Sequence, residues 1–264
     1  TVLIWGSTWL AIEYQLGVVE PEVSVAYRYA AAALLLFAWC RFRGLSLRFG
    51  LKNHVYFVLL GLLLFCLNYI FAYRAQVYIT SALAAIAFST MLWMNIILSR
   101  IIFGTRVTLH VLAGALLGIV GIVVLFAPQI ESIAVTDSMF FGSILALGGA
   151  LTASFGNMLS QSAQKRKLPV VETNTWGMFY GAILTSTVAL ASGHEFNFDA
   201  TFTYISSLAY LAVFGSVIAF GAYLTLLGRI GAHKAGYVTV MFPVVAVILS
   251  VAFEGMQLTG TIIT

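Results

Sequence analysis

The sequence predicts an all-α polytopic membrane protein with ten transmembrane helices, arranged as two inverted five-helix repeats. Three observations support this fold class: an apolar composition, regularly spaced apolar segments, and an internal repeat whose copies differ in charge polarity. Of the 264 residues, 61% are hydrophobic and 8% are charged, and the mean hydropathy is +1.02. Because soluble domains carry about 25% charged residues, this composition excludes an ordinary water-soluble domain.

Apolar segments of about 17 to 25 residues are long enough to cross the roughly 30 Å hydrocarbon layer of a membrane. The predicted spans are nine, at residues 2–17, 23–39, 54–78, 82–103, 109–127, 139–161, 173–192, 204–227 and 235–253. A tenth span begins near Leu258 and is incomplete in this chain. We therefore expect a first five-helix repeat at residues 1–128 and a second, inverted repeat at residues 129–264.

The loops between these spans predict the orientation of the chain, because Lys and Arg accumulate in cytoplasmic loops. Eleven of the thirteen basic residues lie in alternate loops, as Arg41, Arg43, Arg48, Lys52, Arg100, Arg106, Lys165, Arg166, Lys167, Arg229 and Lys234. The opposite loops contain no Lys or Arg, and their acidic residues are Glu20, Glu22, Glu131, Asp137, Glu195, Asp199 and Glu254. We expect both termini to be cytoplasmic. Since the basic residues lie between spans, the net charge of +4 does not indicate nucleic-acid binding.

The internal repeat comprises residues 79–108 and 230–259, which share seven identities when aligned without gaps. The first copy ends in basic residues, Arg100 and Arg106, whereas the second begins basic and ends with Glu254. Opposite polarity is expected of an inverted repeat in a membrane, and such repeats place a substrate cavity between the two halves. The repeat therefore favours a transporter.

Several short motifs carry a resemblance to a known family over the whole chain. They are Trp5-Gly6-Ser7, Tyr27-Arg28-Tyr29-Ala30, and the paired Leu-Ser and Gly-x-x-x-Thr positions of the repeat. Together with the ten-span pattern, they resemble the EamA-type members of the drug/metabolite transporter superfamily. The family often has Gly-Glu before spans five and ten, whereas this chain has Gly104-Thr105 and Gly255-Met256.

Within that superfamily, the aromatic-rich third and fourth spans are most similar to the bacterial YddG-type exporters. This resemblance implies a secondary transporter of the bacterial cytoplasmic (inner) membrane. Its expected activity is export of neutral, especially aromatic, amino acids by alternating access through a central aromatic-lined cavity.

The first and third spans supply candidate substrate-binding residues. Trp5 and Trp9 are four residues apart, as are Tyr69 and Tyr73, so each pair projects from one helix face. A tyrosine hydroxyl within a membrane needs a partner or water. This favours a lined cavity, although helix packing with an internal hydrogen bond would satisfy the same requirement.

Four further spans add candidates that would bind the substrate's polar groups or extend the wall. They are, in chain order, Thr90, Trp93, Asn157, Tyr223, Tyr237 and Met241. The last two precede Pro243, and a proline within a span bends the helix and frees a carbonyl, often near substrate in transporters. Pro243 could equally be a packing kink, and Asn157 and Tyr223 could be contacts between helices.

Apart from Arg100, which is counted with the loop that follows its span, the charged residues within the spans are Glu13, Arg28 and Arg74. An arginine in a membrane usually pairs or faces water. Arg28 could meet a substrate carboxylate, or it could pair with Glu13 or Glu20 or extend its head to the interface.

Other classes of function are less favoured. The chain has neither His-Glu-x-x-His nor Gly-x-Ser-x-Gly, so we expect no catalytic residues and no enzyme; a receptor or structural protein would not require the repeat. Another small organic cargo, such as a cationic drug, is the alternative within transport.

Cys40 and Cys66 lie in apolar runs and indicate no disulfide or metal site. We expect no cofactor, a bilayer and an amino acid as partners, and a monomer or weak homo-oligomer.

Overall fold

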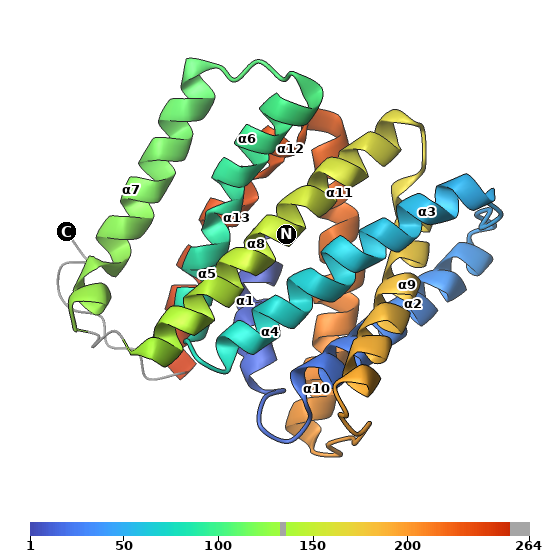
Figure 1. The fold of residues 1–264 in the computed structure, drawn as a ribbon, viewed down its shortest axis with the longest axis horizontal. Helices are drawn as coiled ribbons and strands as arrows, with labels where there is room; N and C mark the ends of the chain where they lie inside the picture. Colours follow the sequence, from blue (N-terminus) through green and yellow to red (C-terminus); the bar gives the residue numbers. More distant parts are fainter. Residues whose placement is uncertain (133–135, 254–264) are drawn as a thin grey trace.

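The computed structural model describes residues 1–132 and 136–253, and every regular element in these ranges is helical (Figure 1). The expected tenth span near Leu258 and the motif Gly255-Met256 lie outside the described residues. Each of the other nine predicted spans coincides with one helix or with a continuous series of helices.

The first 132 residues contain eight helical segments: α1 (Val2–Glu13), α2 (Pro21–Phe42), α3 (Leu51–Leu60), η1 (Gly61–Leu67), α4 (Asn68–Gln76), α5 (Ser81–Ser89), α6 (Met91–Phe103) and α7 (Leu109–Ser132). The remaining segments are α8 (Asp137–Lys165), α9 (Val170–Ala191), α10 (Phe202–Tyr210), η2 (Leu211–Ile218), α11 (Ala219–Ile230), α12 (Ala232–Ala235) and α13 (Tyr237–Phe253).

Six helical stretches of the described chain are long and apolar enough to cross a membrane: Pro21–Phe42, Leu51–Gln76, Ser81–Phe103, Asp137–Lys165, Phe202–Ile230 and Ala232–Phe253. Two shorter apolar helices, Val2–Glu13 and Leu109–Gly121, accompany them. The protein is therefore a polytopic membrane protein. In Figure 1 the α6–α7 and α8–α9 connections lie at the upper edge, and the α1–α2 and α9–α10 connections lie at the lower edge.

Local sequence signals account for several helix ends. Pro21 is the first residue of α2. An N–H at this position has no partner within the helix, so the lack of an N–H in proline costs no hydrogen bond. The side chains of Thr80, Thr136 and Thr201 cap α5, α8 and α10 by accepting a backbone N–H. Gly104 ends α6 with φ 64°, a left-handed conformation that glycine adopts without steric cost.

The helices pack around α8, which Figure 1 shows crossing the molecule between α4 and α6. α2 packs along α9, α1 packs on α13, and α13 packs on α5. α7 lies at one side of the molecule and contacts α13 (Figure 1). The main buried cluster extends from α1 to α13 and is rich in aromatic side chains. Cys40 and Cys66 are buried free thiols.

Two spans carry a π-helical stretch in their middle. η1 interrupts the third span and η2 interrupts the eighth. A π-helical turn widens the helix by one residue and commonly occurs at functional sites. η1 also approaches α9 very closely, because a Cβ built on Gly61 would lie 2.8 Å from the carbonyl oxygen of Gly177 and 2.8 Å from the nitrogen of Gly181.

Candidate functional site

A central cavity of about 60 Å³ lies between helices from six of the nine spans. A cavity of this size has room for a few water molecules. Its lining residues are Trp5, Thr8, Trp9, Ile12, Leu64, Asn68, Tyr69, Ala72, Phe88, Met91, Ala153, Asn157, Phe220, Tyr223 and Phe242. Five of the ten predicted site residues are therefore brought together here: Trp5, Trp9, Tyr69, Asn157 and Tyr223.

The indoles of α1 form one wall of this cavity. The Trp5 ring meets the ring of Phe220 edge to face, with centroids 5.1 Å apart, and lies 4.8 Å from the ring of Tyr223. Trp5 Nε1 donates a hydrogen bond to the carbonyl oxygen of Gly215 at 3.2 Å. One turn later, the Trp9 ring lies 5.0 Å from that of Phe88. The wall thus offers aromatic faces and edges to a ligand, and the indole N–H of Trp5 already has a hydrogen-bond partner.

A small polar cluster lies at the cavity on the α8 side. Asn157 Nδ2 donates to the hydroxyl of Tyr223 at 3.1 Å and lies 3.4 Å from Oδ1 of Asn95. All three side chains are buried. Because amide and hydroxyl groups can both donate and accept hydrogen bonds, this cluster can bind either charged group of a zwitterion.

Tyr69 and Tyr73 occupy different environments, although they are four residues apart on one helix. The Tyr69 ring lines the cavity and lies 5.1 Å from the ring of Tyr29. Tyr73 is completely buried outside the cavity lining, and its hydroxyl donates to Oε1 of Gln15 at 2.7 Å. The expected aromatic wall therefore includes Tyr69, whereas Tyr73 joins the third span to the α1–α2 connection.

The structure does not bring the other four predicted residues to the cavity lining. Thr90 donates to the carbonyl oxygen of Ala87 at the break between α5 and α6. Trp93 packs in a separate cluster with α7 and α13, and the Tyr237 hydroxyl in that cluster donates to the carbonyl oxygen of Val111. Met241 is 58% exposed.

Helix rotation explains these differences. The break at Thr90 turns Met91, rather than Trp93, toward the cavity. In α13 the neighbour of Met241, Phe242, lines the cavity, since adjacent residues of a helix point in directions about 100° apart.

Sequence reasoning missed several lining residues that the same helical periodicity could have indicated. Thr8 and Ile12 lie three residues after Trp5 and Trp9, and Phe220 lies three residues before Tyr223. These spacings place them on the predicted faces.

Arg28 lies directly behind the cavity. Its guanidinium is fully buried, with Cζ 4.4 Å from the ring centroid of Tyr69. Nε donates to Oγ of Ser216 at 2.9 Å, and Nη2 approaches the Tyr69 hydroxyl at 3.5 Å. Within the described chain Arg28 forms no ion pair, and Nη1 has no hydrogen-bond partner.

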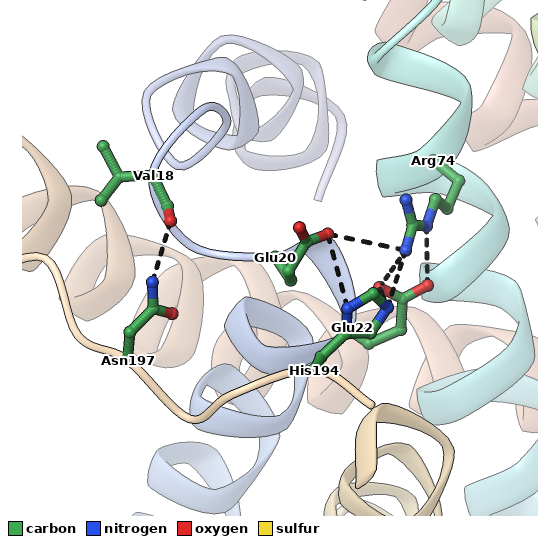
Figure 2. Close-up of polar contacts among 6 residues, drawn as sticks. All are labelled: Val18, Glu20, Glu22, Arg74, His194 and Asn197. Atoms are coloured by element: carbon green, nitrogen blue, oxygen red, sulfur yellow. Dashed lines mark hydrogen bonds and ion pairs between the residues drawn. The ribbon is translucent and has the colours of Figure 1, made fainter. Parts of the chain in front are cut away.

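An ion-pair cluster lies where the α9–α10 connection meets the start of α2 and the end of α4 (Figure 2). Arg74 binds Glu22 through two contacts, Nε to Oε1 at 2.7 Å and Nη2 to Oε2 at 2.8 Å, and lies 3.6 Å from Glu20. His194 Nε2 lies 3.7 Å from Glu22. Beside the cluster, Asn197 Nδ2 donates to the carbonyl oxygen of Val18 at 3.0 Å. Glu20, Glu22 and His194 could hold a metal ion by spacing, but Arg74 supplies the positive charge there.

A family model matches most of the chain, and several relatives match it over most of their length. The model of the EamA-like transporter family matches residues 1–127 and 140–263. The inner membrane transporter YedA of Escherichia coli is 28% identical over 261 residues, which cover 96% of this chain and 80% of YedA. The protein PagO of Salmonella typhimurium is 26% identical over 94% of this chain and 80% of its own length. The transporter YoaV of Bacillus subtilis is 23% identical, over 92% and 82% respectively.

A solved crystal structure shares the fold. It superimposes with a TM-score of 0.79, at 20% identity, and covers 99% of this chain and 88% of the other.

Proposed function

We propose that this chain, which belongs to the EamA-like transporter family, exports neutral, especially aromatic, amino acids across the bacterial inner membrane through the central cavity. The observation that carries the proposal is the cavity itself, which combines aromatic walls with a buried amide and hydroxyl cluster. The relative YedA is named an inner membrane transporter, which supports the location. The basic loops support cytoplasmic termini.

The packing of the helices supports an alternating-access mechanism between two inverted halves. If each span is paired with the one five positions later, the contact of α1 with α13 corresponds to that of α8 with α6. The contact of α2 with η2 corresponds in the same way to that of α9 with η1. The cavity is lined by spans one, three and four and by their counterparts six, eight and nine. Such internal symmetry is typical of transporters in which two halves rock about a central site.

The chemistry of the lining favours a ligand with a large apolar part. Trp5, Trp9, Tyr69 and Phe220 present ring surfaces that suit an indole or phenyl group. Asn157 and Tyr223 can hydrogen-bond the ligand's charged groups. Among the residues that the structure describes, the lining includes no Asp or Glu, which disfavours the alternative of a cationic drug. In this proposal the halves move apart to admit the ligand to the cavity.

Uptake into liposomes tests this proposal. Purified protein should take up labelled Trp and Phe in a saturable manner, with competition by unlabelled aromatic amino acids. Comparison with and without a pH gradient determines whether transport is proton-coupled. The Trp5→Ala variant should lose uptake, whereas Met241→Ala, on the exposed face of α13, should retain it. If folded protein transports no amino acid, the cargo belongs to another class and other small organic solutes should be tried.

A further inference from the structure

Among the residues that the structure describes, no carboxylate forms an ion pair with Arg28. The neighbours of its guanidinium are the hydroxyl of Ser216 and the rings and hydroxyl groups of Tyr29 and Tyr69, and the Tyr73 hydroxyl also faces it. The carboxylates of Glu20 and Glu22 pair instead with Arg74. A buried cation without a counter-ion is costly, and ionisable residues of this kind within a membrane mark ligand or ion pathways.

The guanidinium is also within reach of the cavity. Tyr69 and Thr8 both line the cavity, and the Tyr69 ring lies beside Arg28. A Cβ built on Gly215 would lie 2.8 Å from Thr8 Cγ2 and 3.1 Å from Arg28 Nη2. Because Gly215 has no side chain, Thr8 and Arg28 can both approach this position. Rotation of the Tyr69 ring away from Arg28 would join the guanidinium to the cavity.

The donor geometry specifies the ligand group. Nη1 is buried and has no hydrogen-bond partner among the described residues, and the Nη2 contact to the Tyr69 hydroxyl is long, at 3.5 Å. Two adjacent N–H groups of an arginine match the two oxygens of a carboxylate, in a charge-assisted bidentate pair. For an ammonium group the described lining offers neutral hydrogen-bond partners such as Asn157 and Tyr223 but no carboxylate.

We propose that Arg28 is the carboxylate-binding residue of the cavity, and that the ligands are apolar or aromatic monocarboxylates for which an ammonium group is dispensable. This inference rests on the proposed transport function and narrows its chemistry. Aromatic amino acids are members of the class, and aromatic acids without an amino group are equally accepted. The carboxylate of the ligand acts as the counter-ion of Arg28. The apolar part of the ligand packs against the aromatic wall of the cavity.

Binding of three probes to the purified full chain in lipid nanodiscs tests the inference. Phenylalanine carries both charged groups, 3-phenylpropionate lacks the ammonium, and phenethylamine lacks the carboxylate. We expect the first two to bind with similar affinity and phenethylamine to bind about ten-fold or more weakly, the range for losing a charge-assisted hydrogen bond. Equal binding of all three, or no binding of 3-phenylpropionate, would overturn the role of Arg28.

The variant Arg28→Gln adds a second measurement. It should weaken binding of 3-phenylpropionate about ten-fold or more and leave phenethylamine binding unchanged, a pattern that general unfolding cannot produce. Arg43→Gln is the matched control, because it removes an exposed charge next to the same helix and should alter neither ligand. If Arg28→Gln does not fold, the three probes on the unaltered protein still decide the question. Binding of 3-phenylpropionate without phenylalanine would reject amino-acid export and keep the carboxylate site.

Discussion

Replacing Gly61 with alanine should weaken the contact between η1 and α9. A Cβ at Gly61 would meet backbone atoms of Gly177 and Gly181, each at 2.8 Å, whereas ordinary contacts begin near 3.4 Å. The obstructing atoms are backbone, so the two helices must separate by several tenths of an ångström. Overpacking of this kind costs about 1–3 kcal/mol. Since alanine favours a helix over glycine by about 1 kcal/mol, the clash is partly offset, and we expect a net loss of up to about 2 kcal/mol.

Thermal unfolding in a lipid or detergent environment measures this effect. The control is Gly221→Ala, because Gly221 lies within α11 and a Cβ there meets no atom within 4 Å. That variant should be as stable as the parent or gain up to about 1 kcal/mol from helix propensity. The Gly61 variant should also transport poorly, since η1 holds Leu64 at the cavity and leads into Asn68 and Tyr69. Equal melting temperatures for the two variants would refute the close approach of η1 and α9.

Three further predictions follow from the same contacts. Glu22→Gln should cost about 1–3 kcal/mol, less than a fully buried pair because the Arg74 side chain is 32% exposed. In a double-mutant cycle with Arg74→Gln, the double variant should lose less stability than the sum of the two single losses, because either substitution already breaks the pair. Tyr73→Ala should cost about 3–5 kcal/mol by leaving a cavity in the core, so its melting temperature should fall; a stable variant that loses only transport would contradict this placement. Met241→Ala should leave the rate of uptake and its KM unchanged. A raised KM would show that Met241 contributes to the substrate site.

The sequence was sufficient to predict an all-helical, polytopic membrane protein and the positions of nine helical segments. Composition and apolar segment length depend on the solvent around the chain, and a bilayer demands long apolar helices whatever the tertiary contacts are. For this reason all nine predicted spans within the described residues are helical. The π-helical stretches η1 and η2 within two of these spans were not predicted. A π-helical turn adds one residue to an α-helix, and the spacing of apolar residues in the sequence does not reveal this.

The site could be predicted only in part, and helix rotation is the reason. Spacing of four identifies residues on a shared face, which correctly grouped Trp5 with Trp9 at the cavity. It also grouped Tyr69 with Tyr73. Tyr69 lines the cavity, whereas Tyr73, one turn further along the helix, contacts Gln15 instead. Local periodicity shows which side chains share a face but does not show which neighbour each turn of that face meets.

The sequence alone therefore determined that this chain is an apolar, multi-span protein with aromatic helix faces. These properties depend only on the composition of the chain and on the spacing of its residue types. Only the tertiary structure decided which arginine is neutralised. Arg28 and Arg74 are equivalent in the sequence as basic residues within spans. The fold places Glu20 and Glu22 beside Arg74, whereas the described neighbours of Arg28 are hydroxyl groups and rings. Electrostatic pairing depends on distances of a few ångströms between helices, and these distances arise when the helices pack.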